Sequence, residues 1–244
     1  MSGMYDNIEG IVRRQMVIFF VIDTSGSMAG TKIGTVNTAI REVIPELKGI
    51  GGSDVDLKIA VLDFSSGCKW LFPVPIPVDS FVWNNLEADG VTDLGCAMKE
   101  LNAKMCKEAF LGVPSGSVAP AIFLMSDGEA TDDYNDGIET LKKNNWYKYA
   151  IRVALAIGDD AKIEELEKFT GNREAVLTAY TPEALKKMIR FVTITSAQIG
   201  SKSQPVQSDG QIVSKQQNMV DQLNIFQQTD SVVASATSTN ADDW

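Results

Sequence analysis

The fold is decided by residues 16–27, which read Met-Val-Ile-Phe-Phe-Val-Ile-Asp-Thr-Ser-Gly-Ser. Seven consecutive apolar residues with no polar alternation predict a strand covered on both faces. Arg13 and Arg14 before this run superficially resemble the start of a signal peptide. However, the run is short for such a segment and lacks a small-x-small cleavage site after it. It is also far short of the ~20 residues that span a bilayer.

The same kind of apolar run recurs along the chain and alternates with stretches of helical spacing. The strand-like runs are 16–22, 57–64, 119–125, 149–157 and 175–178, and the helix-like stretches are 33–47, 95–110, 135–145, 160–169 and 182–194. This alternation predicts an α/β fold with a doubly wound, mostly parallel central sheet and helices on both faces. Residues 68–72 follow the second run too closely for a helix, so they predict a short antiparallel edge strand. Pro73, Pro75 and Pro77 then predict a loop.

The composition divides the chain into a lead-in at 1–13, a domain at 14–194 and a polar tail at 195–244. Within the tail, 196–210 and 231–244 are rich in polar residues and are expected to be disordered. The segment 211–226 differs, because Ile212, Met219 and Phe226 help form one apolar face. It predicts an amphipathic helix that docks either on the domain or on another protein.

Charge and histidine content exclude several functions. The chain has 32 acidic and 22 basic residues, a net charge of −10 and no histidine. An acidic chain of this kind is not expected to bind nucleic acid or an anionic membrane, since both need clustered positive charge. Without imidazole, Ser-His-Asp triads, Cys-His dyads and histidine-ligated zinc are excluded.

The three cysteines are Cys68, Cys96 and Cys106. An odd number without CxxC spacing predicts free, buried thiols and a reducing compartment, and therefore a cytoplasmic protein. Cys96 and Cys106 are expected on one helix, where they would lie about 15 Å apart, too far for a disulfide.

Oxygen-bearing side chains follow the predicted strands. Asp23, Ser25 and Ser27 end the first run, and Asp127 follows the run 119–125. A glycine-bounded turn at 88–95 presents Thr92 before a helix. The carboxyl ends of parallel strands meet at one edge, so these residues are expected to lie together. Two carboxylates with hydroxyls and no nitrogen or sulfur ligand favour Mg²⁺, with Mn²⁺ and Ca²⁺ left open. Taken singly, each segment could instead be an ordinary helix cap or turn.

Asp23-x-Ser25-x-Ser27, Thr92 and Ser126-Asp127-Gly128, in this order, closely resemble the metal-ion-dependent adhesion site (MIDAS) of von Willebrand factor type A (VWA) domains. The resemblance covers roughly residues 14–194 and implies a Rossmann-like VWA fold. Within the family, the chain looks most like the bacterial TerY-like branch, which is associated with tellurium resistance. The Arg-Gln lead-in to the first strand and the run Met-Ser-Asp-Gly-Glu-Ala-Thr-Asp-Asp at 125–133 carry that likeness.

The resemblance implies that Ser25, Ser27 and Thr92 are direct ligands, and that Asp23 and Asp127 bind the ion directly or through water. It also implies a non-enzymatic protein-interaction module in which a partner's Asp or Glu completes the coordination. By analogy with the TerY-like branch, the partners would include a protein kinase and a PP2C-type phosphatase in stress response or phage defence. Because the domain is acidic, such a partner is expected to carry basic residues around its carboxylate.

The alternative is a Mg²⁺-dependent phosphohydrolase using Asp23 and Asp127, since haloacid dehalogenase-type enzymes also place an aspartate after an apolar strand. Those enzymes resemble DxDx(T/V), whereas the second acid position here is Ser25. The chain has no P-loop, no dinucleotide-binding glycine motif and no GxSxG motif. Glu129, Asp132, Asp133 and Asp136 form an acidic cluster that favours a solvated helix start over a second metal site. Trp70 is expected to pack in the core, whereas for Trp83 and Trp146 packing and partner contact both stay open.

Overall fold

Strand β1 (Arg14–Asp23) runs through the middle of a seven-stranded sheet in the computed structural model. The structure describes residues 13–52, 54–112, 116–159, 161–202 and 214–236. The other strands are β2 (Val55–Ser65), β3 (Gly67–Trp70), β4 (Ile76–Pro77), β5 (Ala121–Ser126), β6 (Ile151–Ile157) and β7 (Val176–Ala179). Their order is β3-β2-β1-β5-β6-β7, with β4 also paired to β2. All pairs are parallel except those of β3 and β4 with β2, which confirms the predicted mostly parallel sheet.

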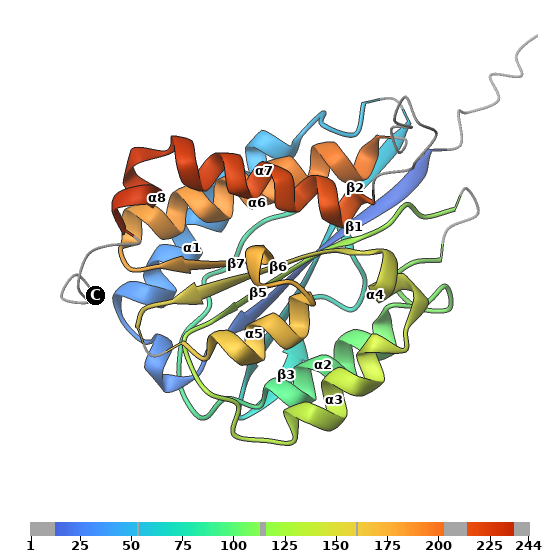
Figure 1. Cartoon of the computed structure of the whole chain (residues 1–244). Helices are drawn as coiled ribbons and strands as arrows, with labels where there is room; N and C mark the ends of the chain where they lie inside the picture. The colour runs from blue at the N-terminus through green and yellow to red at the C-terminus, as the bar shows by residue number, and fades with distance from the viewer. Residues whose placement is uncertain (1–12, 53, 113–115, 160, 203–213, 237–244) are drawn as a thin grey trace, which may run out of the picture.

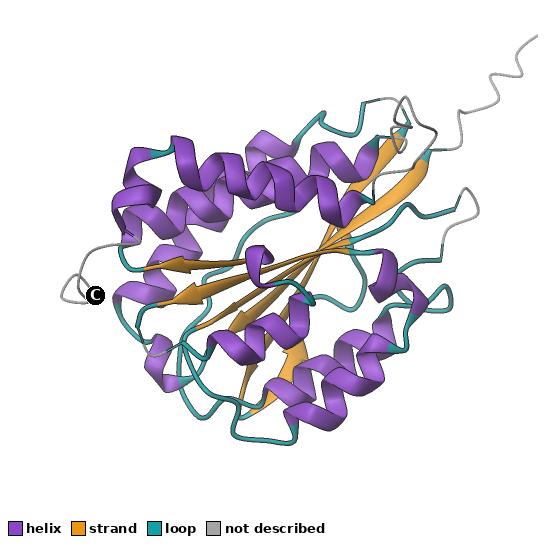
Figure 2. Ribbon diagram, viewed as in Figure 1, coloured by secondary structure: helices purple, strands orange, loops and turns teal. Residues whose placement is uncertain are grey.

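Helices cover both faces of this sheet (Figures 1 and 2). One face carries α1 (Thr31–Val43), α6 (Pro182–Ser201), α7 (Lys215–Thr229) and α8 (Ser231–Ala236). The other carries α2 (Leu94–Lys104), α3 (Tyr134–Lys142), α4 (Asn145–Tyr149) and α5 (Ile163–Thr170). Short 3-10 helices lie at Gly26–Met28, Ile44–Leu47 and Arg173–Ala175. None of the helices in the described part of the chain is long and apolar enough to cross a membrane.

The alternate side chains of β1 belong to two different cores. Ile18 and Phe20 face the α1–α6 layer, whereas Val17 and Phe19 face the α2–α3 layer. Every residue from Met16 to Ile22 is completely buried. The unbroken apolar run therefore reflects a central strand that is packed on both faces, because neither set of side chains meets water.

The structure differs from the sequence prediction at the end of α2 and in the loop after Pro73. The helix predicted at 95–110 stops at Lys104, and the following residues form turns in which the backbone N–H groups of Phe110 and Leu111 reach back to Lys104 and Cys106. The loop predicted after Pro73 contains β4, whose Ile76 and Pro77 pair with Ile59 and Lys58. Proline is tolerated there because β4 lies at the edge of the sheet.

The expectation of disorder at 196–210 is wrong for 196–201, because α6 continues to Ser201. Thr193, Ser196 and Ala197 are fully buried, and Gly200 lies so close to β1 that an added Cβ would come within 2.1 Å of the Met16 side chain. The small size of these residues allows the helix to approach the sheet. The expectation of disorder is also wrong for 231–236, where α8 forms. The remaining parts, 203–210 and 237–244, lie outside the described residues.

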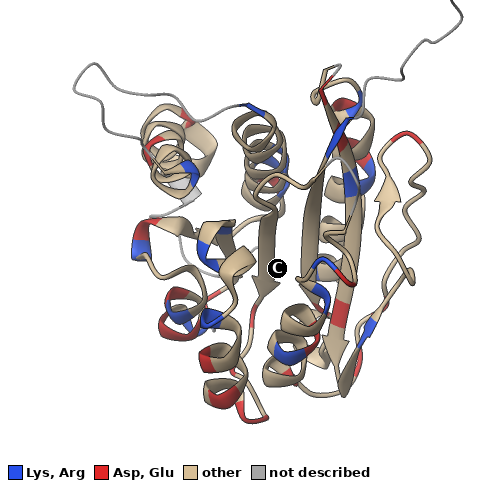
Figure 3. Cartoon of the chain, turned by 90° about the vertical axis from the view of Figure 1, so that its right-hand side faces the viewer, with Lys and Arg blue, Asp and Glu red and all other residues tan. Residues whose placement is uncertain are grey.

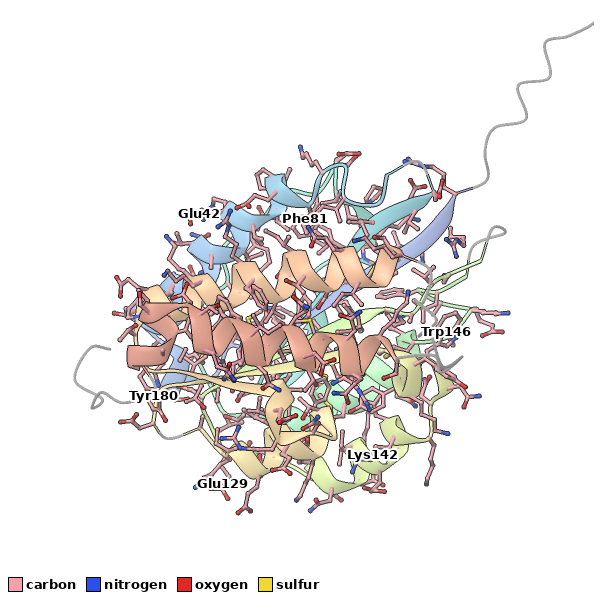
Figure 4. The ribbon with its side chains drawn as sticks, turned by 45° about the horizontal axis from the view of Figure 1, so that its top comes forward. Glu42, Phe81, Glu129, Lys142, Trp146 and Tyr180 are labelled. Atoms are coloured by element: carbon pink, nitrogen blue, oxygen red, sulfur yellow. A yellow bond between two sulfur atoms is a disulfide. The ribbon has the colours of Figure 1, made fainter. Side chains whose placement is uncertain are left out.

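Helix α7 occupies most of the segment predicted as an amphipathic helix at 211–226, of which 211–213 lies outside the described residues. It docks on the domain itself. Met219, Val220 and Leu223 are buried in the core shared with α6, and Phe226 stacks on Phe191 with ring centroids 4.0 Å apart. Figure 4 shows the two helices lying side by side.

The prediction of free thiols is wrong for two of the three cysteines. Cys68 on β3 and Cys96 on α2 form a disulfide, with their Cα atoms 6.1 Å apart, whereas Cys106 is free. The two residues are 28 positions apart in sequence and meet only because α2 packs against the edge strand β3. Cys106 also lies beyond the end of α2, so the expected pair of cysteines on one helix does not exist.

Candidate metal centre

The order of the strands reverses at β1, which has β2 on one side and β5 on the other. Chain connections leave such a point in opposite directions and open a crevice at the carboxyl ends of the strands. Asp23 ends β1 and Ser126 ends β5, and the register pairs Ile22 with Met125 immediately before them. In Figure 4, Glu129 and Tyr180 mark this edge of the molecule, and Trp146 lies at the opposite end.

Asp23 is the most deeply placed polar group of the site. Its side chain is completely buried, its Oδ1 accepts a hydrogen bond from the Ser25 N–H at 2.8 Å, and its Oδ2 accepts one from the Ser126 hydroxyl at 2.6 Å. Burial raises the pKa of Asp23 above its ordinary value, although the hydrogen bonds from Ser126 and Ser25 act in the opposite direction. A cation beside this carboxylate would therefore stabilise its charged form.

Two serines connect the first loop to Asp127. The hydroxyl oxygens of Ser25 and Ser27 lie 3.1 Å apart, and Ser27 donates to Asp127 Oδ1 at 2.7 Å. Ser25 and Asp127 are buried, whereas Ser27 is exposed. The DxSxS spacing has this effect because the 3-10 helix at 26–28 turns the chain back, so that alternate side chains face the same crevice.

The loop carrying Thr92 is fixed to both neighbouring segments. Gly26 N–H donates to Gly90 O at 3.0 Å, and Thr92 exchanges hydrogen bonds with Thr131 through its N–H at 3.1 Å and its C=O at 2.8 Å. Thr92 is buried, and its hydroxyl lies 3.4 Å from the place where a Cβ on Gly128 would stand. All five predicted site residues are thus brought to one crevice: Asp23, Ser25, Ser27, Thr92 and Asp127.

Sequence reasoning missed Lys32, which lies in the first turn of α1. Its Nζ is 2.6 Å from Asp127 Oδ2, and the side chains of Lys32 and Asp127 are 16% and 0% exposed. Both oxygens of Asp127 are therefore engaged, one by the Ser27 hydroxyl and one by the Lys32 ammonium. The direction of a lysine side chain on a helix does not follow from spacing alone, so the sequence held no clear signal for this contact.

The residues present fit a hard divalent cation. The site gathers two carboxylates and three hydroxyls, and the described residues contain no group of three His, Cys, Asp or Glu side chains arranged to hold a metal ion. Gly128 leaves room next to the hydroxyls, because a Cβ there would contact both Thr92 Oγ1 at 3.4 Å and Ser27 Oγ at 3.7 Å. Such a donor set of hard oxygen ligands suits Mg²⁺ or Mn²⁺.

The acidic cluster after Asp127 has a structural role. The two oxygens of Asp132 accept hydrogen bonds from Gly95 N–H and Cys96 N–H, each at 2.7 Å, at the start of α2. Asp133 caps α3 by accepting from Asp136 N–H. Carboxylates at helix starts satisfy free N–H groups. This role agrees with the helix start that the sequence favours over a second metal site. Figure 3 shows basic residues scattered among acidic ones on the helices.

Three tryptophans, Trp70, Trp83 and Trp146, differ in burial. Trp70 packs edge-on against Phe110 at 4.8 Å and donates to Glu100, which agrees with the expected packing role. Trp83 is only 8% exposed, and its indole N–H donates to Asn37 at 3.1 Å. Trp146 is half-buried near the opposite end of the sheet. None of them belongs to the metal crevice.

The family model for the von Willebrand factor type A domain matches residues 18–193. The chain therefore belongs to the VWA family, and α7 and α8 lie outside the matched region. A comparison with curated protein sequences gives no match.

Solved structures share the fold at low sequence identity. The von Willebrand factor type A protein from Catenulispora acidiphila is 20% identical over 76% of this chain and 43% of that one, with a TM-score of 0.56. The ArnB paralog VWA2 from Sulfolobus acidocaldarius is 16% identical over 75% of this chain and 45% of that one, with a TM-score of 0.56. Proximal thread matrix protein 1 from the mussel byssus, solved with a zinc-occupied MIDAS motif, is 19% identical over 75% and 48%, with a TM-score of 0.55. The chain thus spans under half the length of these proteins.

Proposed function

We propose that this chain is a non-enzymatic, metal-dependent protein-interaction module. The observation that carries the proposal is the meeting of two carboxylates and three hydroxyls from the ends of β1 and β5 and from the loop before α2. Asp23, Ser25, Ser27, Thr92 and Asp127 would hold the ion, which we take to be Mg²⁺. When bound, the ion would supply positive charge to a carboxylate of the partner. The zinc-occupied MIDAS motif of the mussel protein supports a metal role for this crevice in the family.

The same geometry disfavours the phosphohydrolase alternative. A nucleophilic aspartate must reach a phosphorus atom, yet Asp23 is completely buried and both of its oxygens accept hydrogen bonds. The general acid of a DxD motif is also missing, because position 25 is a serine whose hydroxyl lies beside Ser27. Asp23 is instead placed to orient the loop and to lend charge to an ion.

The proposal extends to the TerY-like branch. It is supported there by the Arg-Gln pair at the start of the first strand and by the run 125–133. It then includes a protein kinase and a PP2C-type phosphatase as partners, and roles in tellurium resistance, stress response or phage defence. A cytoplasmic location rests on this resemblance alone, since the Cys68–Cys96 disulfide removes the support that free thiols would have given.

The first test is calorimetric titration of the full chain with Mg²⁺ and Mn²⁺. The wild-type chain should bind one ion, and Asp23→Ala and Thr92→Ala should weaken binding at least about 100-fold and about tenfold, the first because it removes a buried charge from the site. Asp89→Ala is the matched control, because Asp89 is exposed in the Thr92 loop and its carboxylate bonds only to Gly90 N–H among the described residues. Equal ion binding by all four chains would refute the proposed site.

The second test concerns the interaction. Affinity purification in Mg²⁺ and in EDTA, compared between wild type, Asp23→Ala and Asp89→Ala, should yield a partner that depends on both the ion and Asp23. Kinase and PP2C-type phosphatase subunits should be among the captured proteins. Capture that is the same in EDTA and in Asp23→Ala would argue against a metal-dependent interaction.

A further inference from the structure

The ion pair between Lys32 and Asp127 places a fixed positive charge inside the proposed metal centre. Lys32 is the only Lys or Arg among the described residues that forms an ion pair with either carboxylate of the site. The pair is sheltered from water, since the Asp127 side chain is 0% exposed and that of Lys32 is 16% exposed. An ion pair that is shielded in this way is screened much less by salt than a surface pair.

The charge of the site depends on this lysine. Asp23 and Asp127 carry two negative charges, and the Lys32 ammonium compensates one of them. A divalent ion would therefore leave the loaded site with one net positive charge, whereas the two carboxylates alone would leave it neutral. An incoming carboxylate is attracted by the net charge as well as by the open coordination position.

We infer that Lys32 sets this charge: it weakens binding of the divalent ion and strengthens binding of a partner carboxylate to the loaded site. The inference rests on the proposed function and assigns a role to a residue outside the metal-ligand set. Weaker metal binding follows because the ion and the ammonium repel each other and share Asp127. Stronger carboxylate binding follows because the ammonium adds attraction beside the ion without occupying a ligand position of its own.

The rest of the crevice gives no other source of this charge. Asp23 forms hydrogen bonds with Ser25 N–H and the Ser126 hydroxyl, which are both neutral donors. The nearby Lys99 and Lys162 are engaged with Asp136 and Glu129 and are about half exposed. Lys32 is thus placed to act on the ion, while the other cations compensate surface acids.

The test measures Mn²⁺ binding to the full chain by electron paramagnetic resonance of the free ion. Lys32→Met keeps an unbranched side chain of similar length, and it should bind Mn²⁺ about tenfold more tightly than wild type, which is about 1.4 kcal/mol. Lys32→Arg keeps the charge and should stay within about threefold of wild type. Lys48→Met is the matched control, because Lys48 is exposed beyond the far end of α1 and should leave the affinity unchanged.

Acetate then serves as the probe for a partner carboxylate. Its binding to the Mn²⁺-loaded chain is followed by the water-proton relaxation rate, which falls when acetate replaces metal-bound water. Lys32→Met should bind acetate about threefold to tenfold more weakly than wild type, and Lys48→Met should match wild type. Replacement of a lysine with a purely structural role would not tighten metal binding and weaken acetate binding at once.

The outcomes separate this inference from the proposed function. Mn²⁺ binding that is equal or weaker in folded Lys32→Met, with wild type binding the ion, overturns the role of Lys32 and leaves the metal centre intact. If wild type binds no Mn²⁺ but Lys32→Met does, the lysine prevents the ion from binding. That result would support the inference that Lys32 weakens metal binding. If neither chain binds Mn²⁺, the metal centre and the role of Lys32 both fall.

Discussion

The loops at the carboxyl end of the sheet are held by hydrogen bonds, whereas the C-terminal helices α7 and α8 combine a few hydrogen bonds with a buried apolar contact to the domain. At the site, Asp23, Ser27 and Thr92 each depend on a polar partner from another segment. In α7, by contrast, the docking residues Met219 and Leu223 are completely buried in the core shared with α6. Changes in the first region should therefore alter binding more than stability, and changes in the second should do the reverse.

A large effect on stability without an effect on metal binding is expected at the α6–α7 contact. Leu223→Ala removes a fully buried side chain and should lower the free energy of unfolding by about 3 kcal/mol, because it loses apolar burial and leaves a cavity. Mn²⁺ affinity should stay within about twofold of wild type. Urea denaturation and metal titration of the same sample test both parts. Ile225→Ala is the control, since Ile225 is 54% exposed on the same helix and should cost under about 0.5 kcal/mol.

A metal affinity that changes as strongly as the stability in Leu223→Ala would break the comparison. It would mean that α7 communicates with the strand-end loops through the sheet, rather than forming a separate stabilising layer.

The disulfide is the one covalent element near the site, and it sharpens the comparison because it should affect both properties. The double substitution Cys68→Ser and Cys96→Ser removes a bridge between residues 28 positions apart in sequence. It should lower the free energy of unfolding by about 3 kcal/mol, because the unfolded chain is no longer constrained. It should also weaken metal binding severalfold, since Cys96 follows Thr92 by one turn at the start of α2.

Two measurements check the disulfide. Thiol titration of the denatured chain without reductant should count one thiol, from Cys106, and three after reduction. Cys106→Ser should leave metal affinity unchanged. A count of three thiols before reduction would show that the bridge does not form and would restore the original expectation from the cysteine spacing.

The sequence predicted the β1 strand and the meeting of the five oxygen-bearing residues beyond it, whereas their role as metal ligands stays a prediction. A seven-residue apolar run is short for a helix and favours a buried strand, and polar residues that follow parallel strands gather at the carboxyl end of the sheet. By contrast, the Cys68–Cys96 bridge, the Lys32–Asp127 ion pair and the end of α6 depend on which elements pack together. Gly200 illustrates the limit, since a glycine in a polar stretch gives no sign that it faces the Met16 side chain.

A smaller effect is expected at Gly128. Gly128→Ala would place a methyl group in contact with the Thr92 and Ser27 hydroxyls, at 3.4 and 3.7 Å. These are ordinary contact distances, so stability should change by less than about 1 kcal/mol. Metal affinity should fall about tenfold, because the methyl takes room beside two proposed ligands. Gly34→Ala, in open space within α1, is the matched control and should raise stability slightly. Unchanged metal binding in Gly128→Ala would place the ion elsewhere.

The smallest effect is expected where α7 meets α8. Lys187 donates to Asp230 at 2.9 Å, and Val232 and Val233 donate their N–H groups to the same carboxylate. The hydrogen bond from Lys187 contributes most to lowering the pKa of Asp230 below its ordinary value of 3.8. Because the folded pKa is the lower one, the stabilisation is present above pH 3.8 and disappears as the pH falls through the lowered value.

Asp230→Asn should therefore cost at most about 1 kcal/mol at pH 7, since the pair is partly exposed to water. The difference from wild type should shrink as the pH falls from 3.8 through the lowered pKa of folded Asp230, because the wild-type carboxylate then becomes protonated as well. Urea denaturation at pH 7, 5 and 3 measures this trend. Mn²⁺ affinity at pH 7 should not change, because Asp230 bonds to Lys187, Val232 and Val233 and not to any of the proposed ligands. A pH-independent difference would contradict this assignment, because asparagine keeps an oxygen that can cap α8 and only the lost charge depends on pH.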